Sequence, residues 1–276
     1  MNALEIRGLT KRRGDFALQG LDLTLPAGCI MGLIGENGAG KSTTIRLILN
    51  ALSRDGGTVA VYGKDNRALT PLEREDIGAV LDEVGLPEYM TARQIGRMMA
   101  GIFTRWQPEV YRGYLRRLAL PEDKPFRDFS RGMKMKLGLA AALSHQPKLL
   151  LLDEATSGLD PVVRDEILTI FADFTRDEEH AVLISSHIVS DLEKICDYIA
   201  FLHKGRLLLC EEKDRLTEEY GILRGGTDGI APAAVCGRHA TPYGTEYLVR
   251  RDAVPVGMAL GQVNIEDLFV FMAKEA

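Results

Sequence analysis

The sequence predicts an α/β protein with a mainly parallel sheet as its core, an antiparallel β part at the N-terminus, a helical insertion and a small C-terminal appendage. Two observations predict this fold class. Apolar runs of strand length alternate with helical stretches along most of the chain, as in sheets that helices cover on both faces. The run at 149–152 is four consecutive leucines, which is typical of a strand buried on both sides.

The length and composition narrow the class of protein. A chain of 276 residues accommodates one α/β domain of about 200 residues and an appendage. Its 46% hydrophobic and 26% charged residues exclude wholesale disorder. Lys and Arg number 34 against 39 Asp and Glu, a net charge of −5, so no nucleic-acid partner is expected. No apolar stretch approaches the ~18 residues that span a bilayer, so a transport function would need a pore from another polypeptide.

The N-terminal part of the chain reads as strands around one glycine-rich loop. Leu21, Leu23 and Leu25 alternate with polar residues, which is the period of a strand with one buried face. We expect a loop at 35–40, a helix from there to residue 52, and strands at 3–7, 18–25, 29–34 and 58–62.

Residues 71–145 have a different texture. After a strand at 77–81 the strand signals fade, and helical stretches follow at 92–104, 108–119 and 132–145. This pattern predicts a helical insertion into the sheet domain at about 84–145.

The strand pattern returns at 149–152, and Pro161 then opens a helix. The elements expected next are a strand at 181–185, a helix at 188–195, and paired strands at 198–202 and 206–209. Glycines and a proline at 225–232 indicate a linker, and the remainder reads as short strands with a final helix at 265–272. We therefore expect a main domain at 1–220 and a small extension at 221–276.

Residues 35–42, G-E-N-G-A-G-K-S, match the pattern G-x-x-x-x-G-K-[ST] of P-loop NTPases, between a strand and a helix. Glycines let the backbone N–H groups point inward, and the helix N-terminus favours a polyphosphate. Lys41 can reach the β- and γ-phosphates, and the Ser42 hydroxyl can bind Mg²⁺. The predicted nucleotide-binding residues are Gly35, Glu36, Asn37, Gly38, Ala39, Gly40, Lys41, Ser42 and Thr43.

Two carboxylates follow the leucine strand, at the strand end where open α/β sheets bind their ligands. Asp153 would hold the hydration shell of Mg²⁺. Glu154 faces a different direction and could polarise an attacking water. Three weaker pieces accompany them: Phe129–Met133, Ser157–Asp160 and Ser185–His187. Taken singly, Ser130 and Asp160 could be simple helix N-caps, and His187 a structural histidine.

In this order and spacing, residues 3–220 resemble the ATP-binding cassette (ABC) ATPases. The resemblance implies a catalytic glutamate at Glu154, a switch histidine at His187, a signature motif at 129–133 and a D-loop at 157–160. It further implies a head-to-tail dimer, of two identical or two paralogous subunits, with ATP and Mg²⁺ between them. Ser130 and the Gly132 N–H would touch the γ-phosphate in trans, with Asp160 nearby.

The S-R-G-M form of the signature is similar to that of ATPase subunits of bacterial drug, peptide or lipid exporters. That resemblance implies ATP hydrolysis that powers export through separate transmembrane permease subunits. It places the chain in the cytoplasm, peripheral on the inner face of the membrane. The alternative is a soluble ABC ATPase of the translation or DNA-repair type.

The chain departs from the family pattern at several positions. In the signature, Arg131 replaces a glycine and Met133 a glutamine. The position of the Q-loop glutamine is Asp82, whose carboxylate can still bind Mg²⁺. The adenine-stacking aromatic falls near Arg13. The Arg13 guanidinium could stack on the base, Phe16 could do so in its place, or neither residue does.

In the family, a groove after the Q-loop accepts a short helix of the membrane subunit. Leu86, Tyr89, Met90 and Trp106 are the candidate groove residues. The alternative is that these four belong to the ordinary core of a small helical subdomain.

Overall fold

The strands form three sheets in the computed structural model, which describes residues 1–276 apart from 228, 243, 256–257 and 276. The central sheet is parallel from β9 to β6, and β10 pairs antiparallel with β9. Its strand order is β10 (Arg206–Glu212), β9 (Tyr198–His203), β3 (Ile30–Ile34), β8 (Ala181–Ser186), β7 (Leu149–Asp153) and β6 (Ile77–Val80).

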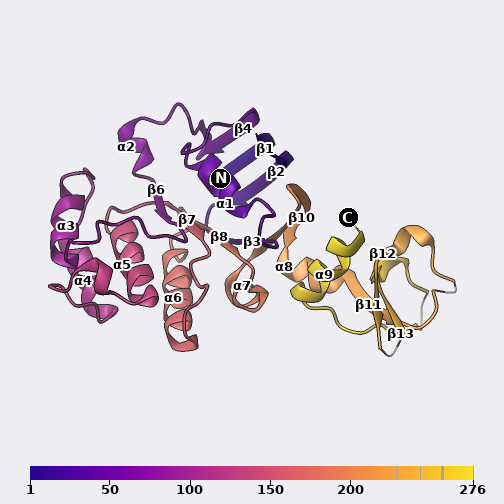
Figure 1. Ribbon diagram of the computed structural model, residues 1–276. Coiled ribbons are helices and arrows are strands. Elements are labelled where there is room, and N and C mark those ends of the chain that lie inside the picture. The colour runs from indigo at the N-terminus through magenta and orange to yellow at the C-terminus, as the bar shows by residue number, and fades with distance from the viewer. Residues whose placement is uncertain (228, 243, 256–257, 276) are drawn as a thin grey trace.

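The leucines of β7 explain how this sheet is held. All five residues of the strand are buried. Leu150 and Leu152 face one hydrophobic core, whereas Leu149 and Leu151 face the other, because successive side chains of a strand point to opposite faces. The first core is covered by α5 (Arg131–Leu143), α6 (Pro161–Phe174) and α7 (Val189–Ile195), and the second by α1 (Lys41–Ile48) and the N-terminal sheet (Figure 1).

The N-terminal sheet is antiparallel, as the sequence predicts. Strand β1 runs well past the predicted end at residue 7, because register shifts around Gly8, whose φ is 56°, let pairing continue beyond the irregularity. The sheet order is β2 (Phe16–Pro26), β1 (Asn2–Arg13), β4 (Gly56–Val61) and β5 (Lys64–Asp65).

The helical insertion contains α3 (Ala92–Ala100), α4 (Pro108–Arg117) and α5, after a short helix α2 (Pro71–Arg74). Thr91 and Gln94 form a capping box that starts α3. The helix ends at Ala100, four residues before its predicted end, with Gly101 as its C-cap. Tyr111 of α4 packs against Gly96, where an added Cβ would lie 2.5 Å from the ring. The glycine therefore sets how closely α3 and α4 approach.

A third, antiparallel sheet lies at the C-terminal end, with the order β11 (Tyr220–Arg224), β13 (Gly244–Arg250) and β12 (Val235–Thr241). The expected linker at 225–232 is wrong: this segment connects two strands of one sheet, because β11 and β12 both pair with β13. The final helix α9 (Ile265–Glu275) packs on β12 and on the central domain, where Phe269 meets Phe201 at a centroid distance of 5.3 Å. Helix α8 (Lys213–Glu219) precedes β11.

Every helix in the described part of the chain is too short or too polar to cross a bilayer.

Candidate nucleotide site

The glycine-rich loop connects β3 to α1 and is built from backbone that other residues fit poorly. A Cβ on Gly35 would lie 2.4 Å from the Leu202 carbonyl oxygen of β9. Gly38 and Gly40 have φ values of 86° and 113°, in the region that favours glycine. The loop therefore bends tightly and places the N-terminus of α1 at its open side, which is an arrangement that binds anions.

Lys41 is the first residue of α1, and its side chain is bent back into this loop. Its Nζ donates hydrogen bonds to the carbonyl oxygens of Gly35, at 2.7 Å, and Glu36, at 3.3 Å. It also lies 3.1 Å from Glu154 Oε1. A buried ammonium group in contact with a carboxylate is a strong local charge, and a polyphosphate would compete with that carboxylate for it.

The two carboxylates at the end of β7 are held by the neighbouring strand β8. Parallel register places Asp153 opposite Ser185, whose hydroxyl donates a 2.6 Å hydrogen bond to Asp153 Oδ1. The Glu154 N–H donates to the Ser185 carbonyl oxygen at 3.1 Å. The sequence points to the run Ser185–His187 but assigns no role to Ser185 itself; strand register was the signal that could have shown it opposite Asp153.

Glu154 has a left-handed backbone conformation, with φ at 52°, which is uncommon for a residue with a side chain. His187, just after β8, lies with Nδ1 2.7 Å from Glu154 Oε2. The carboxylate is thus fixed from two sides, by the Lys41 ammonium and by the imidazole. A carboxylate so oriented is suited to accept a proton from a water molecule at a fixed place.

A cavity of about 390 Å³ opens over these groups. Among its lining residues are Arg13 and Phe16 on one side and Asp82 on another. Phe16 is in close contact with the loop, because a Cβ on Gly40 would lie 2.7 Å from its Cζ. The full lining is Arg13, Phe16, Glu36, Asn37, Gly38, Gly40, Lys41, Ser42, Thr43, Asp82 and Glu154.

The remaining predicted residues lie elsewhere. Ser130, Gly132 and Asp160 line a second cavity, of about 450 Å³, which shares no lining residue with the first. Ser130 caps α5 and accepts a hydrogen bond from the Met133 N–H. Asp160 caps α6 in the same way. Both residues are therefore helix caps within this chain, and their side chains border a separate hollow.

Residues 18–157, which are 140 of the 276, match the ABC transporter family. The chain belongs to this family. It is an ABC-type ATPase and an ATP-binding subunit of a transporter, with ATP hydrolysis coupled to transport. The predicted fold class and family resemblance are confirmed.

Named relatives of this ABC ATPase are transport proteins. It is 32% identical over 275 residues to the bacitracin transport ATP-binding protein BcrA of Enterococcus faecalis, covering 95% of this chain and 87% of BcrA. It is 32% identical over 218 residues to the ABC transporter ATP-binding protein YtrB of Bacillus subtilis, covering 79% and 74%. A solved ATP-binding subunit of an ABC transporter superposes with a TM-score of 0.71 at 26% identity, covering 78% of this chain and 92% of that one.

Two of the departures from the family pattern touch each other in this ABC ATPase. Arg131 Nη2 lies 2.9 Å from Asp82 Oδ1, and both side chains are about half exposed. Asp82 lines the first cavity and Arg131 the second. The guanidinium also lies beside Gly158, where an added Cβ would be 3.1 Å from its Nη1. One ion pair therefore joins the edges of the two cavities.

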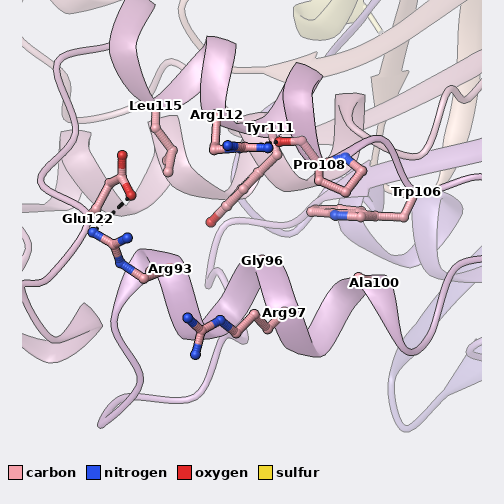
Figure 2. A pocket seen from close by; sticks show the side chains of 10 residues that line it. All are labelled: Arg93, Gly96, Arg97, Ala100, Trp106, Pro108, Tyr111, Arg112, Leu115 and Glu122. Atoms are coloured by element: carbon pink, nitrogen blue, oxygen red, sulfur yellow. Dashed lines mark hydrogen bonds and ion pairs between the residues drawn. The ribbon is translucent and has the colours of Figure 1, made fainter.

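The expectation of one groove formed by Leu86, Tyr89, Met90 and Trp106 is wrong. Leu86 lines a cavity of about 370 Å³ next to β6 and α5. Trp106 lines a different one, of about 320 Å³, between α3 and α4 (Figure 2). Met90 packs against the core, and Tyr89 is exposed, with the Arg127 guanidinium 5.0 Å from its ring centroid. The helices of the insertion separate residues that are near in sequence.

His145 borders the cavity of Leu86 and is stacked on Phe103, with ring centroids 4.1 Å apart. Burial lowers the pKa of this histidine, despite the contact of its Nε2 with the Ile77 carbonyl oxygen at 3.3 Å. The ring is therefore held in its neutral form where the insertion meets the central sheet.

Proposed function

We propose that this subunit hydrolyses MgATP to power export through separate transmembrane subunits, and that two copies, or this chain and a paralogue, complete each ATP site. The observation that carries the proposal is the division of the motif residues between two separate cavities. One cavity has the phosphate loop and Glu154, and the other has Ser130, Gly132 and Asp160. A head-to-tail pair would set the second cavity of one copy against the first cavity of the other.

The names of relatives support export as the direction of transport. Besides BcrA, they include the lantibiotic transport ATP-binding protein SrtF of Streptococcus pyogenes, at 32% identity, and the daunorubicin/doxorubicin resistance protein DrrA of Streptomyces peucetius, at 34%. Their names refer to bacitracin, to lantibiotics and to daunorubicin or doxorubicin. We infer an exported compound of this broad kind, and a place for the chain at the cytoplasmic face of its membrane subunits.

The donor atoms at the site fit Mg²⁺. The described residues contain no cluster of three or more His, Cys, Asp or Glu side chains that could hold a metal unaided. Mg²⁺ commonly keeps its waters and takes only one or two protein oxygens beside the phosphates of a nucleotide. Ser42 and Asp82 at the cavity, with Asp153 as a ligand of the waters, supply such oxygens. When bound, the ion would neutralise charge on the phosphates.

The chain's own residues account for binding and for the proton transfer. The loop N–H groups and Lys41 would hold the β- and γ-phosphates, and this would draw Lys41 away from Glu154. Glu154, oriented by His187, would then accept the proton of the attacking water. Arg13 and Phe16 both border the cavity and are the candidates for stacking on adenine.

We further infer that the cavity of Leu86 receives a helix of the membrane subunit. It is mainly apolar, with Val80, Val84, Leu86 and Phe103 in its walls, and its lining includes the residues on either side of Asp82. An occupant would therefore sit beside the nucleotide cavity. Leu86→Asp should abolish co-purification with the membrane subunits of the transporter. Val110→Asp, an exposed apolar residue on α4 outside this cavity, is the matched control.

The concentration dependence of hydrolysis tests the proposal as a whole. If each site needs a second copy, the MgATPase rate per subunit of the purified chain should rise with protein concentration and then saturate. A rate per subunit that stays constant over a hundredfold dilution would contradict a site shared between two copies of this chain. Drug uptake into inside-out vesicles, with and without the chain, then tests export.

A further inference from the structure

The pair Asp82–Arg131 joins the edges of the two cavities through charge, and its members are two of the residues at which the chain departs from the family pattern. A neutral glutamine is usual at the first position and a glycine at the second. Replacing both introduces one negative and one positive group, and the structure brings them to 2.9 Å. The two departures therefore act together, as partners, rather than as separate substitutions.

The positions of the two charges set what each can meet. Asp82 borders the cavity that holds Lys41 and the phosphate loop, so a polyphosphate bound there places negative charge next to a carboxylate. Arg131 is the first residue of α5 and borders the cavity that would face the second copy. An arginine guanidinium binds phosphate oxygens in a planar, two-pronged way that suits this position.

Because the pair is about half exposed, it is weak enough to be exchanged. Lys136, the other cation that borders the second cavity, pairs with Glu166 at 2.6 Å and is mostly buried, so it is less available. Arg131 is thus the cation of that cavity that is best placed to change partners.

We propose that Asp82 and Arg131 form an exchangeable charge latch: Asp82 holds Arg131 within its own chain, and Arg131 leaves it to bind the phosphates that the second copy presents. Asp82 competes with those phosphates for one guanidinium, and its release leaves the carboxylate to face the cation at its own nucleotide. The two copies then close onto each other only when both hold nucleotide. This inference rests on the proposed two-copy site.

The latch predicts opposite effects from its two members, whereas a merely structural ion pair predicts equal ones. The test uses the full chain carrying Glu154→Gln, which slows turnover, and follows dimer formation by sedimentation as MgATP is raised. Adding Asp82→Asn removes the competing charge but keeps an oxygen that can bind metal, so half-maximal dimerisation should need several-fold less MgATP. Adding Arg131→Leu should raise that concentration about tenfold or more, the size of one charge-assisted contact.

Epistasis sharpens the test. The chain with both Asp82→Asn and Arg131→Leu should dimerise like Arg131→Leu alone, because the charge of Asp82 opposes dimerisation by holding Arg131. Two matched controls remove the same charges nearby: Glu83→Gln, one residue after Asp82, and Arg127→Leu, whose guanidinium faces Tyr89. Neither control should shift dimerisation in either direction by more than twofold. Calorimetry on dilute protein measures the affinity of each single chain for MgATP, so that a change in nucleotide binding is separated from a change in dimerisation.

The outcomes separate the latch from the function on which it rests. If the Glu154→Gln chain forms no dimer with MgATP, the two-copy site is wrong and the latch falls with it. If it dimerises but Asp82→Asn and Arg131→Leu change the MgATP requirement in the same direction, or not at all, the latch alone is overturned.

Discussion

The cavity around Lys41 and the cavity around Gly132 differ in what holds their polar groups. In the first, a buried ammonium, a carboxylate and an imidazole contact one another over a bent loop. In the second, Ser130 and Asp160 serve as helix caps, and the glycine between them has ordinary packing. Under the proposed function, the first cavity binds the triphosphate and the second supplies donors to the nucleotide that another copy presents. Binding and completion of the site are therefore separable properties of one chain.

The largest effect is expected from replacing Glu154, the proposed general base of the first cavity. Glu154→Gln keeps the size of the side chain but removes the proton acceptor, so turnover should fall by about 10²–10⁴ while ATP binding is preserved. Steady-state phosphate release and calorimetry measure the two effects. Full-rate hydrolysis in this variant would show that another group takes the proton.

Removing the Lys41 ammonium should weaken nucleotide binding in the first cavity. Lys41→Ala deletes a charged donor and leaves Glu154 without its neighbour, so MgATP affinity should fall by about 10–100-fold. The shift of melting temperature with MgATP reports this loss. Lys134→Ala, on α5 with its Nζ over the Phe126 ring, is the control and should keep the full shift. Equal protection of both variants by MgATP is the contradicting result.

A pair of glycine substitutions sharpens the contrast between the two halves. Gly132→Ala fits the single chain, because the new Cβ would lie 3.6 Å from Leu159 Cδ2. It should leave single-chain affinity unchanged and lower the rate per subunit by several-fold to about tenfold, through the second copy. Gly40→Ala instead meets Phe16 and an unfavourable φ, so affinity itself should fall. Weakened MgATP affinity of the dilute Gly132→Ala chain would contradict the separation.

The smallest effect concerns the junction between the insertion and the central sheet. His145 has a lowered pKa in the folded chain, so folded and unfolded states are equally neutral well above pH 6.5 and its contribution is then complete. As the pH falls through 6.5, the unfolded state takes up a proton that the folded state refuses, and stability declines.

The decline from this one proton is at most tenfold in the folding constant per pH unit. Urea unfolding between pH 7.5 and 5.5 should therefore show a steeper loss for the natural chain than for His145→Gln. His180→Gln, at a half-buried histidine immediately before β8, is the control. If the stability of the natural chain and of His145→Gln falls equally with pH, His145 does not cause the pH dependence.

What could be predicted from the sequence was local. The phosphate loop is contiguous, so its residues and its place between β3 and α1 follow from one motif and two neighbouring patterns. The four leucines predict a strand with two buried faces. In contrast, Ser185 depends on which strand lies next to β7, and the contact of Arg131 with Asp82 joins residues 49 apart. Such contacts follow from strand register and helix packing, which a single sequence does not state.

The predicted groove shows that residues near one another in sequence can also be separated by the fold. Leu86 and Trp106 are 20 residues apart and both apolar, yet α3 and its turn place them in different hollows. The prediction of a linker at 225–232 is wrong because a long connection between strands of one sheet has the same glycine-rich composition as a linker between domains.

The left-handed backbone of Glu154 has a consequence for the whole assembly. A residue kept in that conformation relies on Ser185, Lys41 and His187, so small damage to β8 can misdirect the carboxylate without touching ATP. Such a subunit would still bind nucleotide and still dimerise. When it is expressed together with the intact chain, it would be incorporated into transporters and inactivate them. Substitutions at Ser185 should therefore be dominant.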